Sequence, residues 1–183
     1  MKSKAILVAL GAGLLTAGTA LAAEPALKLD RAEAAALHSA PISLAKAIAI
    51  AARQGHGKVM NIVSRPGGPD DLYVVTLVAD GHIRTATVDA VSGRFVPSHT
   101  SLAVRQVSRG ERADVTALDA AARPLSAAVA IAVGYTHGKA GDAGLETLRG
   151  GKVAYEVNVL KDGAFYDVWV DPTSGHVIET ATS

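Results

Sequence analysis

The sequence contains no cysteine, and its aromatic side chains are limited to four tyrosines, two phenylalanines and one tryptophan. The absence of thiols excludes a disulfide framework, thiol chemistry and lipid attachment through cysteine. The sequence also has no H-E-x-x-H or G-x-S-x-G motif and no glycine loop placed to bind phosphate. We therefore expect a protein that is not an enzyme and that needs no cofactor.

The N-terminus has the three parts of a secretory signal peptide. Lys2 and Lys4 precede an apolar run over residues 5–15, and Ala20-Leu21-Ala22 provides a small-residue cleavage site. Glycines interrupt the apolar run, whereas a stable membrane span needs about 20 mostly apolar residues. We predict that residues 1–22 are removed and that the product is periplasmic or secreted, without a membrane anchor.

Removal of this leader changes the net charge of the chain. Two lysines and no acidic residue leave with it, so 16 basic and 17 acidic side chains remain. No positive field remains that would attract nucleic acid or anionic lipid. We expect no nucleic-acid partner and no contact with the membrane after cleavage.

An internal repeat dominates the rest of the chain. Residues 73–96 align with residues 155–178 at a constant offset of 82, and eight of the 24 pairs are identical. Upstream, Pro41-Ile42-Ser43 matches Pro124-Leu125-Ser126 at an offset of 83. Self-similarity at a fixed period indicates duplication of one supersecondary unit. The predicted segments are an N-terminal arm with a short helix (23–40), repeat 1 (41–97), a linker with a strand and a short helix (98–123), and repeat 2 (124–180).

Each repeat is predicted to begin with a helix. Ser43 and Ser126 are the expected N-caps, and Gly55 and Gly138 are expected to end the helices in the left-handed conformation. The second helix is apolar nearly all round, which indicates cover on both sides. We therefore expect it to contact the other repeat or the N-terminal arm.

Strands follow each helix, and Asp-Gly pairs between β-type runs indicate tight hairpins. The fold class is therefore α+β, with two tandem repeats that each pack one helix on a three- to four-stranded antiparallel sheet. The expected strands are Val59–Ser64, Leu72–Ala79, Ile83–Asp89 and a short strand at Phe95 in repeat 1, and Leu145–Arg149, Val153–Lys161, Phe165–Asp171 and a short strand at Val177 in repeat 2. The linker helix is expected over residues 114–123.

Strand alternation places Phe165, Asp167 and Trp169 on the sheet face away from the helix. Antiparallel sheets commonly leave one face in water, but a face with the chain's only tryptophan is not fully solvated. Because tryptophan is over-represented at binding hot spots, these three residues are the candidate partner-binding surface. The alternative is that this face packs against the other repeat or against the linker.

The order of a serine-capped helix, a glycine, a strand and four short motifs resembles the PepSY domain. Those motifs are Tyr155-Glu-Val, Asp162-Gly163, Val168-Trp-Val-Asp171 and Ser174-Gly175 in repeat 2, with counterparts in repeat 1. PepSY domains occur in propeptides of thermolysin-like metallopeptidases and in regulators of wall and spore enzymes. The resemblance implies a protein-binding or peptidase-modulating module whose partner is an envelope peptidase or another periplasmic protein. Because no peptidase domain follows, inhibition would act in trans.

His56-Gly57-Lys58 and His137-Gly138-Lys139 recur just after the two helices. We interpret them as polar turns that close the helices. The alternative is a small-molecule or metal-ion sensor in which His56 or His137 lines a site between the repeats. Asp89 and Asp171 open five-residue turns, and we expect their carboxylates to accept backbone N–H groups instead of binding calcium.

Overall fold

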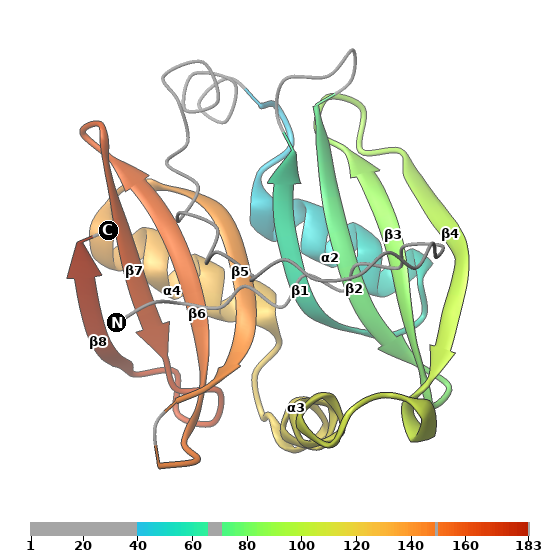
Figure 1. Cartoon of the computed structure of the whole chain (residues 1–183). Helices are drawn as coiled ribbons and strands as arrows, with labels where there is room; N and C mark the ends of the chain where they lie inside the picture. Colours follow the sequence, from blue (N-terminus) through green and yellow to red (C-terminus); the bar gives the residue numbers. More distant parts are fainter. Residues whose placement is uncertain (1–39, 66–70, 149, 183) are drawn as a thin grey trace, which may run out of the picture.

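The computed structural model describes residues 40–65, 71–148 and 150–182. The predicted signal peptide and the predicted helix of the N-terminal arm lie outside the described residues. Eight strands form one antiparallel sheet in the order β4-β3-β2-β1-β5-β6-β7-β8. Two helices, α2 and α4, pack against each other and lie on the same face of this sheet (Figure 1). The two repeats therefore share one continuous sheet.

The predicted fold class is confirmed, since each repeat packs one helix on four antiparallel strands. Repeat 1 consists of α2 (Leu44–Gln54), β1 (Lys58–Arg65), β2 (Leu72–Ala79), β3 (His82–Asp89) and β4 (Phe95–Ala103). Repeat 2 consists of α4 (Leu125–Thr136), β5 (Lys139–Thr147), β6 (Val153–Lys161), β7 (Ala164–Val170) and β8 (Val177–Thr182). Between them lie a 3₁₀ turn, η1 (Val104–Gln106), and α3 (Arg109–Ala120). Among the described helices, none alone is long and apolar enough to cross a membrane, and α3 and α4 reach that length only as a pair bent by 79°.

The two halves of the sheet join where β1 pairs with β5, and we call this junction the seam. Ile62 lies opposite Ala143, and Asn61 and Val63 lie opposite Gly144 and Asp142. In their own repeats, Ile62 and Ala143 pair with Val75 and Val157, which occupy equivalent positions in the duplication. Equivalent strands thus meet antiparallel, and an approximate two-fold axis passes through the Ile62–Ala143 pair.

The core lies between the sheet and the two helices. Alternate residues of β2 and β6 are buried under them, including Val75 and Val157, because successive side chains of a strand point to opposite faces. The helices contribute two matched sets of buried residues: Leu44, Ala47, Ile48 and Ala51 from α2, and Leu125, Ala128, Val129 and Ala132 from α4. The predicted contact of the second helix with the other repeat is confirmed, because α2 packs against α4.

The predicted register of the second helix is wrong by two residues. Tyr73 Oη donates to the Ile42 carbonyl (2.6 Å), and Tyr155 Oη donates to the Arg123 carbonyl (2.9 Å), so the offset before the sheet is 81. Ser43 caps α2 as predicted, but the N-cap of α4 is Pro124. Proline can replace the serine because its fixed φ suits the entry into a helix.

The left-handed residues at the helix ends are histidines, contrary to the prediction for Gly55 and Gly138. His56 has φ 51° and His137 has φ 59°. Gly138 is needed for space, since a Cβ there would lie 2.5 Å from Val159 Cγ1 and 2.6 Å from the Leu160 carbonyl oxygen. The glycine that follows each histidine therefore lets the chain leave the helix in direct contact with the sheet.

The leading strand of repeat 2 begins earlier than predicted. The strand β5 starts at Lys139, directly after the helix, whereas the sequence indicated only residues 145–149. Its first half contains alanine, glycine and aspartate, which have low β-propensity. Pairing with β1 and β6 on both sides supplies the stability that local preference lacks.

The helix of the linker also begins earlier than predicted, at Arg109. Ser108 and Glu111 form a capping box, in which Ser108 Oγ accepts from the Glu111 N–H (3.2 Å) and Glu111 Oε2 accepts from the Ser108 N–H (2.9 Å). This hydrogen bonding lowers the pKa of Glu111. Ser108 and Glu111 thus fix the start of α3 at Arg109, shortly after β4 ends at Ala103.

The helix α3 lies at one end of the seam, below the sheet in Figure 1. Lys58 Nζ, at the start of β1, donates to the carbonyl of Asp119 (3.0 Å) and pairs with its carboxylate (3.3 Å). Thr147 Oγ1, at the end of β5, donates to Asp114 Oδ1 (3.1 Å). One helix therefore holds both strands of the seam.

The turns that open with aspartate are stabilised by its carboxylate, as predicted. Asp171 Oδ1 accepts from the backbone N–H groups of Thr173 (2.9 Å) and Ser174 (2.6 Å) and from Ser174 Oγ (3.0 Å). Asp89 makes the same set of bonds in repeat 1. The hydrogen bonds from serine lower the pKa of both carboxyls. These residues have a structural role that needs no calcium.

We expect Asp171→Ala to lower the free energy of unfolding by about 1 kcal/mol at pH 7, because three donors lose their acceptor. A carboxyl with a lowered folded-state pKa stabilises the protein above its ordinary pKa of 3.8 and loses this effect as the pH falls further. Urea unfolding at pH 7 and at pH 3 measures both values. Thr173→Ala, which keeps the N–H, is the control, and an equal loss at both pH values would contradict the assignment.

Candidate functional site

The face of the sheet away from α2 and α4, here called the open face, differs in chemistry between the repeats. In repeat 2, cross-strand pairs place Asp142 beside Asn158, and Asn158 beside Asp167. Glu156 lies beside Trp169 in the same face. Carboxylates from three adjacent strands are therefore gathered on one surface.

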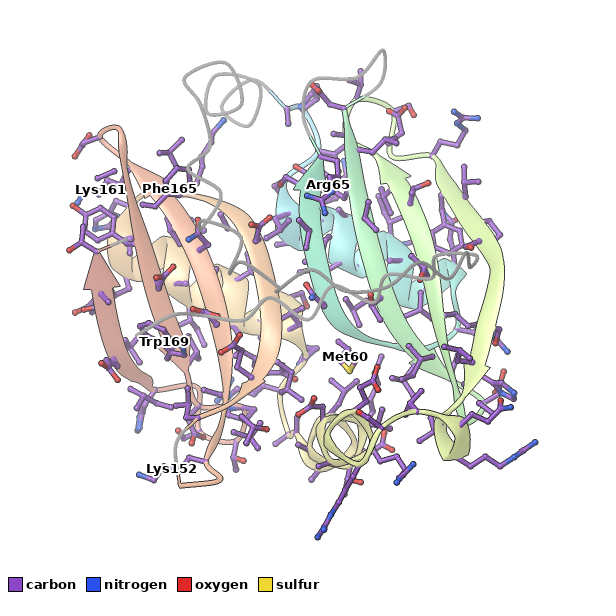
Figure 2. All side chains as sticks on the ribbon, in the orientation of Figure 1. Met60, Arg65, Lys152, Lys161, Phe165 and Trp169 are labelled. Atoms are coloured by element: carbon purple, nitrogen blue, oxygen red, sulfur yellow. The ribbon has the colours of Figure 1, made fainter. Side chains whose placement is uncertain are left out.

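The three predicted partner-binding residues all belong to the open face of β7. Trp169 is only 8% exposed, and Phe165 and Asp167 are partly buried. Figure 2 shows Phe165 near one end of β7 and Trp169 farther along the strand. Asp167 Oδ1 accepts from Asn158 Nδ2 at 2.7 Å. The tryptophan side chain is therefore largely covered and does not protrude from the sheet as an exposed apolar group.

Two acidic residues of β5 extend this surface toward the seam. Asp142 Oδ1 accepts from the Ser64 N–H (2.9 Å), where the pairing of β1 with β5 ends. Burial raises the pKa of Asp142 to about 6, although the Ser64 bond and the Arg65 guanidinium act in the opposite direction. This carboxyl is therefore ionised at neutral pH at a cost in stability.

Glu146 forms a carboxyl pair with Glu156 across the β5–β6 ladder. Burial raises the pKa of Glu146 well above its usual range, and the charge and hydrogen bond of Glu156 raise it further. Asp114 and Asp167 act in the same direction. Two close carboxyls of this kind share a proton, because both cannot ionise without strong repulsion.

Asp114 belongs to α3 and is 8% exposed. Together with Asp142, Glu146, Glu156 and Asp167 it forms what we call the acidic cluster. Of these five residues, only Asp167 is among the site residues predicted from the sequence. The signal for Asp142, Glu146 and Glu156 was the acidic residues on the polar side of β5 and β6, which can be recognised only with the correct start of β5.

Repeat 1 carries different side chains at the equivalent positions. The registers match Asn61 with Asp142, Arg65 with Glu146, Val74 with Glu156, Thr85 with Asp167 and Thr87 with Trp169. The same backbone thus forms with neither acidic residues nor tryptophan at these positions. The acidic cluster and Trp169 are features of repeat 2 that the fold does not require.

The histidines considered as ligands, His56 and His137, lie at the ends of α2 and α4, and both are exposed. Within the described part of the chain, no three His, Asp or Glu side chains are arranged to hold a metal ion. Their left-handed backbone gives both histidines a role in ending the helices. They do not contribute to the acidic cluster.

Comparison with known families identifies the duplicated unit. The PepSY model, described as peptidase propeptide and YPEB domain, matches residues 41–96 and 124–181. The chain belongs to the PepSY family. Both PepSY repeats keep the buried tyrosine of the Tyr-x-Val motif, whose hydroxyl holds the residue before the helix cap. Burial raises the pKa of Tyr155 to about 12, so this phenol stays protonated.

Comparison with curated protein sequences gives no match. Among solved structures, a predicted lipoprotein from Clostridium difficile 630 is similar, with 17% sequence identity and a TM-score of 0.47. The match covers 78% of this chain and 93% of that protein. The tandem PepSY assignment therefore depends on the family match and on the duplicated fold described above.

Proposed function

We propose that this PepSY protein is a non-catalytic envelope module that binds a partner protein, an envelope peptidase, through the open face of repeat 2. The observation that carries the proposal is the divergence of two repeats with matching strand registers at Glu156, Asp167 and Trp169, where repeat 1 has valine and threonines. Repeat 1 forms the same ladder with Thr87 at this position, so the fold does not require a tryptophan there. Selection for recognition accounts for such residues.

The class of partner comes from the family. Its description names peptidase propeptides, which contact the enzyme that they accompany. The leader over residues 1–22 would deliver this chain to the periplasm or the exterior, where envelope peptidases act. The proposed action is therefore inhibition in trans, by a protein that is itself not an enzyme.

We expect the purified chain to slow peptide hydrolysis by a secreted thermolysin-type metallopeptidase. The double variant Phe165→Ile/Asp167→Thr introduces the residues of repeat 1, Ile83 and Thr85, and so preserves the fold. Its inhibition constant should be at least about tenfold weaker, equivalent to about 1.4 kcal/mol. Hydrolysis of a chromogenic peptide at several inhibitor concentrations measures this.

Asp80→Asn provides the control, because it removes an exposed carboxylate from repeat 1 at a left-handed position that asparagine tolerates. It should inhibit like the wild type. If the double variant inhibits as strongly as the wild type, the contact with the peptidase lies elsewhere on the molecule. A wild-type chain that is simply degraded as a substrate would contradict the proposed function.

A further inference from the structure

The sheet ends in two outer strands, β4 and β8, which lie at its opposite edges (Figure 1). Alternate N–H and C=O groups of an edge strand point away from the sheet and can pair with another chain. Natural proteins usually block such edges with proline, with bulges or with charged side chains. Because β4 and β8 are equivalent strands of the two repeats, their edges can be compared position by position.

The edge of repeat 1 is blocked in two ways. Pro97 of β4 lies opposite Ala86 and has no N–H to donate. A proline fits inside an edge strand where the missing N–H would point away from the sheet. Beyond Pro97, the three residues 98–100 of β4 lie opposite Thr85 of β3 alone, so the strand bulges. The strand β4 therefore presents no regular edge to another chain.

The edge of repeat 2 has a hydrogen-bond donor at the position of this proline. Thr180 of β8 lies opposite Val168, and Val168 is equivalent to Ala86 at the offset of 82. Thr180 therefore takes the place of Pro97 in the sheet register. By this equivalence its backbone N–H points away from the sheet, where repeat 1 has none.

The rest of β8 also lacks the usual protection of an edge. Its sequence, Val-Ile-Glu-Thr-Ala-Thr, contains no proline, lysine or arginine, and four of its six residues are β-branched. Its pairing with β7 shifts at Ile178 and is regular over residues 179–182. Residues 178–182 are all exposed. A strand of this composition at an outer edge is suited to pair with another extended chain.

The length of this edge indicates the kind of partner that it fits. A strand of six residues supplies only a fraction of the about 20 to 30 residues that each folded protein contributes to a stable interface. The same length matches a single extended segment, which gains its affinity from main-chain hydrogen bonds. The strand β8 is also the neighbour of β7, which carries Phe165, Asp167 and Trp169. One partner can therefore contact the open face and this edge together.

We propose that an extended segment of the partner protein adds to β8 as a further antiparallel strand of the sheet. The Thr180 N–H would donate to a backbone carbonyl of the segment, and β-branched side chains of the segment would lie beside those of β8. This rests on the proposed function and specifies which part of the partner binds. The segment is recognised by its backbone, and the pairing requires no charge of either sign.

Heteronuclear NMR of the isotopically labelled chain tests this inference. The probe is the acetylated and amidated peptide Ser-Val-Thr-Val-Thr-Ser, and the matched probe carries methyl groups on the backbone nitrogens of its four central residues. The unmodified peptide should shift the amide signals of residues 177–182 and leave those of β4 unchanged. The methylated peptide should bind at least about tenfold more weakly, because its central residues cannot donate main-chain hydrogen bonds.

Thr180→Pro introduces into β8 the proline that repeat 1 has at the equivalent position. It should unfold at about the same urea concentration as the wild type, since an edge strand accommodates proline there, and should bind the unmodified peptide at least about tenfold more weakly. Thr180→Val keeps the N–H and the β-branched shape and should bind like the wild type. A folded Thr180→Pro chain that binds like the wild type would overturn the inference.

The outcomes separate this inference from the proposed function. Equal binding of the two peptides, or shifts confined to other strands, would overturn the inference even if Thr180→Pro fails to fold. Inhibition of a peptidase that Thr180→Pro leaves unchanged would also overturn it and leave the function intact. Peptide binding at β8 without inhibition would contradict the proposed function alone. A dimer that Thr180→Pro dissociates, as measured by sedimentation, would assign the edge to a second copy and overturn the inference.

Discussion

Ile62→Ala is expected to destabilise both repeats together. Ile62 is fully buried at the seam, between Val75 of its own repeat and Ala143 of the other. Replacement of a buried isoleucine by alanine removes three carbons and leaves a cavity, at a cost of about 3 kcal/mol. The free energy of unfolding in urea should fall by about this amount.

The single tryptophan makes the test specific. Trp169 lies in repeat 2, and Ile62 lies in repeat 1, so tryptophan fluorescence reports on the half that carries no substitution. Because the sheet is continuous, the unfolding transition seen by tryptophan fluorescence should shift to the same urea concentration as the transition seen by far-ultraviolet circular dichroism of the whole chain. Ile178→Ala, at a site that is 44% exposed on β8, should cost less than about 1 kcal/mol. An unchanged fluorescence transition in Ile62→Ala would show that the repeats unfold independently.

Asp142→Asn is expected to stabilise the protein at neutral pH. Burial raises the pKa of Asp142 from 3.8 to about 6, and one pKa unit corresponds to about 1.4 kcal/mol. The ionised carboxyl therefore costs about 2 to 3 kcal/mol, which an amide avoids. Asparagine keeps an oxygen that can accept from the Ser64 N–H, and Asn61 occupies the equivalent position of repeat 1.

The pH dependence of this effect has a definite sign. Since the folded-state pKa lies above the unfolded value, Asp142 favours folding most below about pH 4, and this contribution disappears as the pH rises through 6. The free energies of unfolding of wild type and Asp142→Asn should be similar at pH 4 and diverge by pH 7, with the variant more stable. Urea titrations at pH 4, 5, 6 and 7 measure the difference. If the difference in free energy of unfolding stays constant across this range, burial does not raise the pKa of Asp142.

Local patterns were sufficient to predict the hairpins and the duplication. Asp80 and Asp162 both adopt φ 51°, followed by Gly81 and Gly163 at positive φ, as the Asp-Gly pairs indicated. Alternation along β6 also predicted its two faces, because a strand with one buried face has a period of two. These features depend on neighbours in the sequence, so the sequence contains them.

The seam and the acidic cluster depend on contacts between distant segments. The early part of β5 has few β-branched residues, and its pairing with β6 and with Ile62 and Val63 of β1 makes it a strand. Alternation along a strand assigns each side chain to a face only when the start of the strand is known. Because the start of β5 was not predicted, Asp142 and Glu146 could not be assigned to a face of the sheet. Asp114 reaches the cluster through α3, whose position no local pattern indicated. The sequence therefore placed Trp169, Phe165 and Asp167 on one face of the sheet, and missed the acidic residues that surround them.

The antiparallel meeting of β1 with β5 is the geometry of an isologous homodimer, in which one patch contacts its own copy. In a true homodimer, every change on the surface would appear twice. At the axis of a homodimer a residue lies opposite its own copy, whereas here Ile62 lies opposite Ala143. Because the two halves are joined in one polypeptide, each half can change without the other. One half could then specialise in recognition while the other remained a plain scaffold.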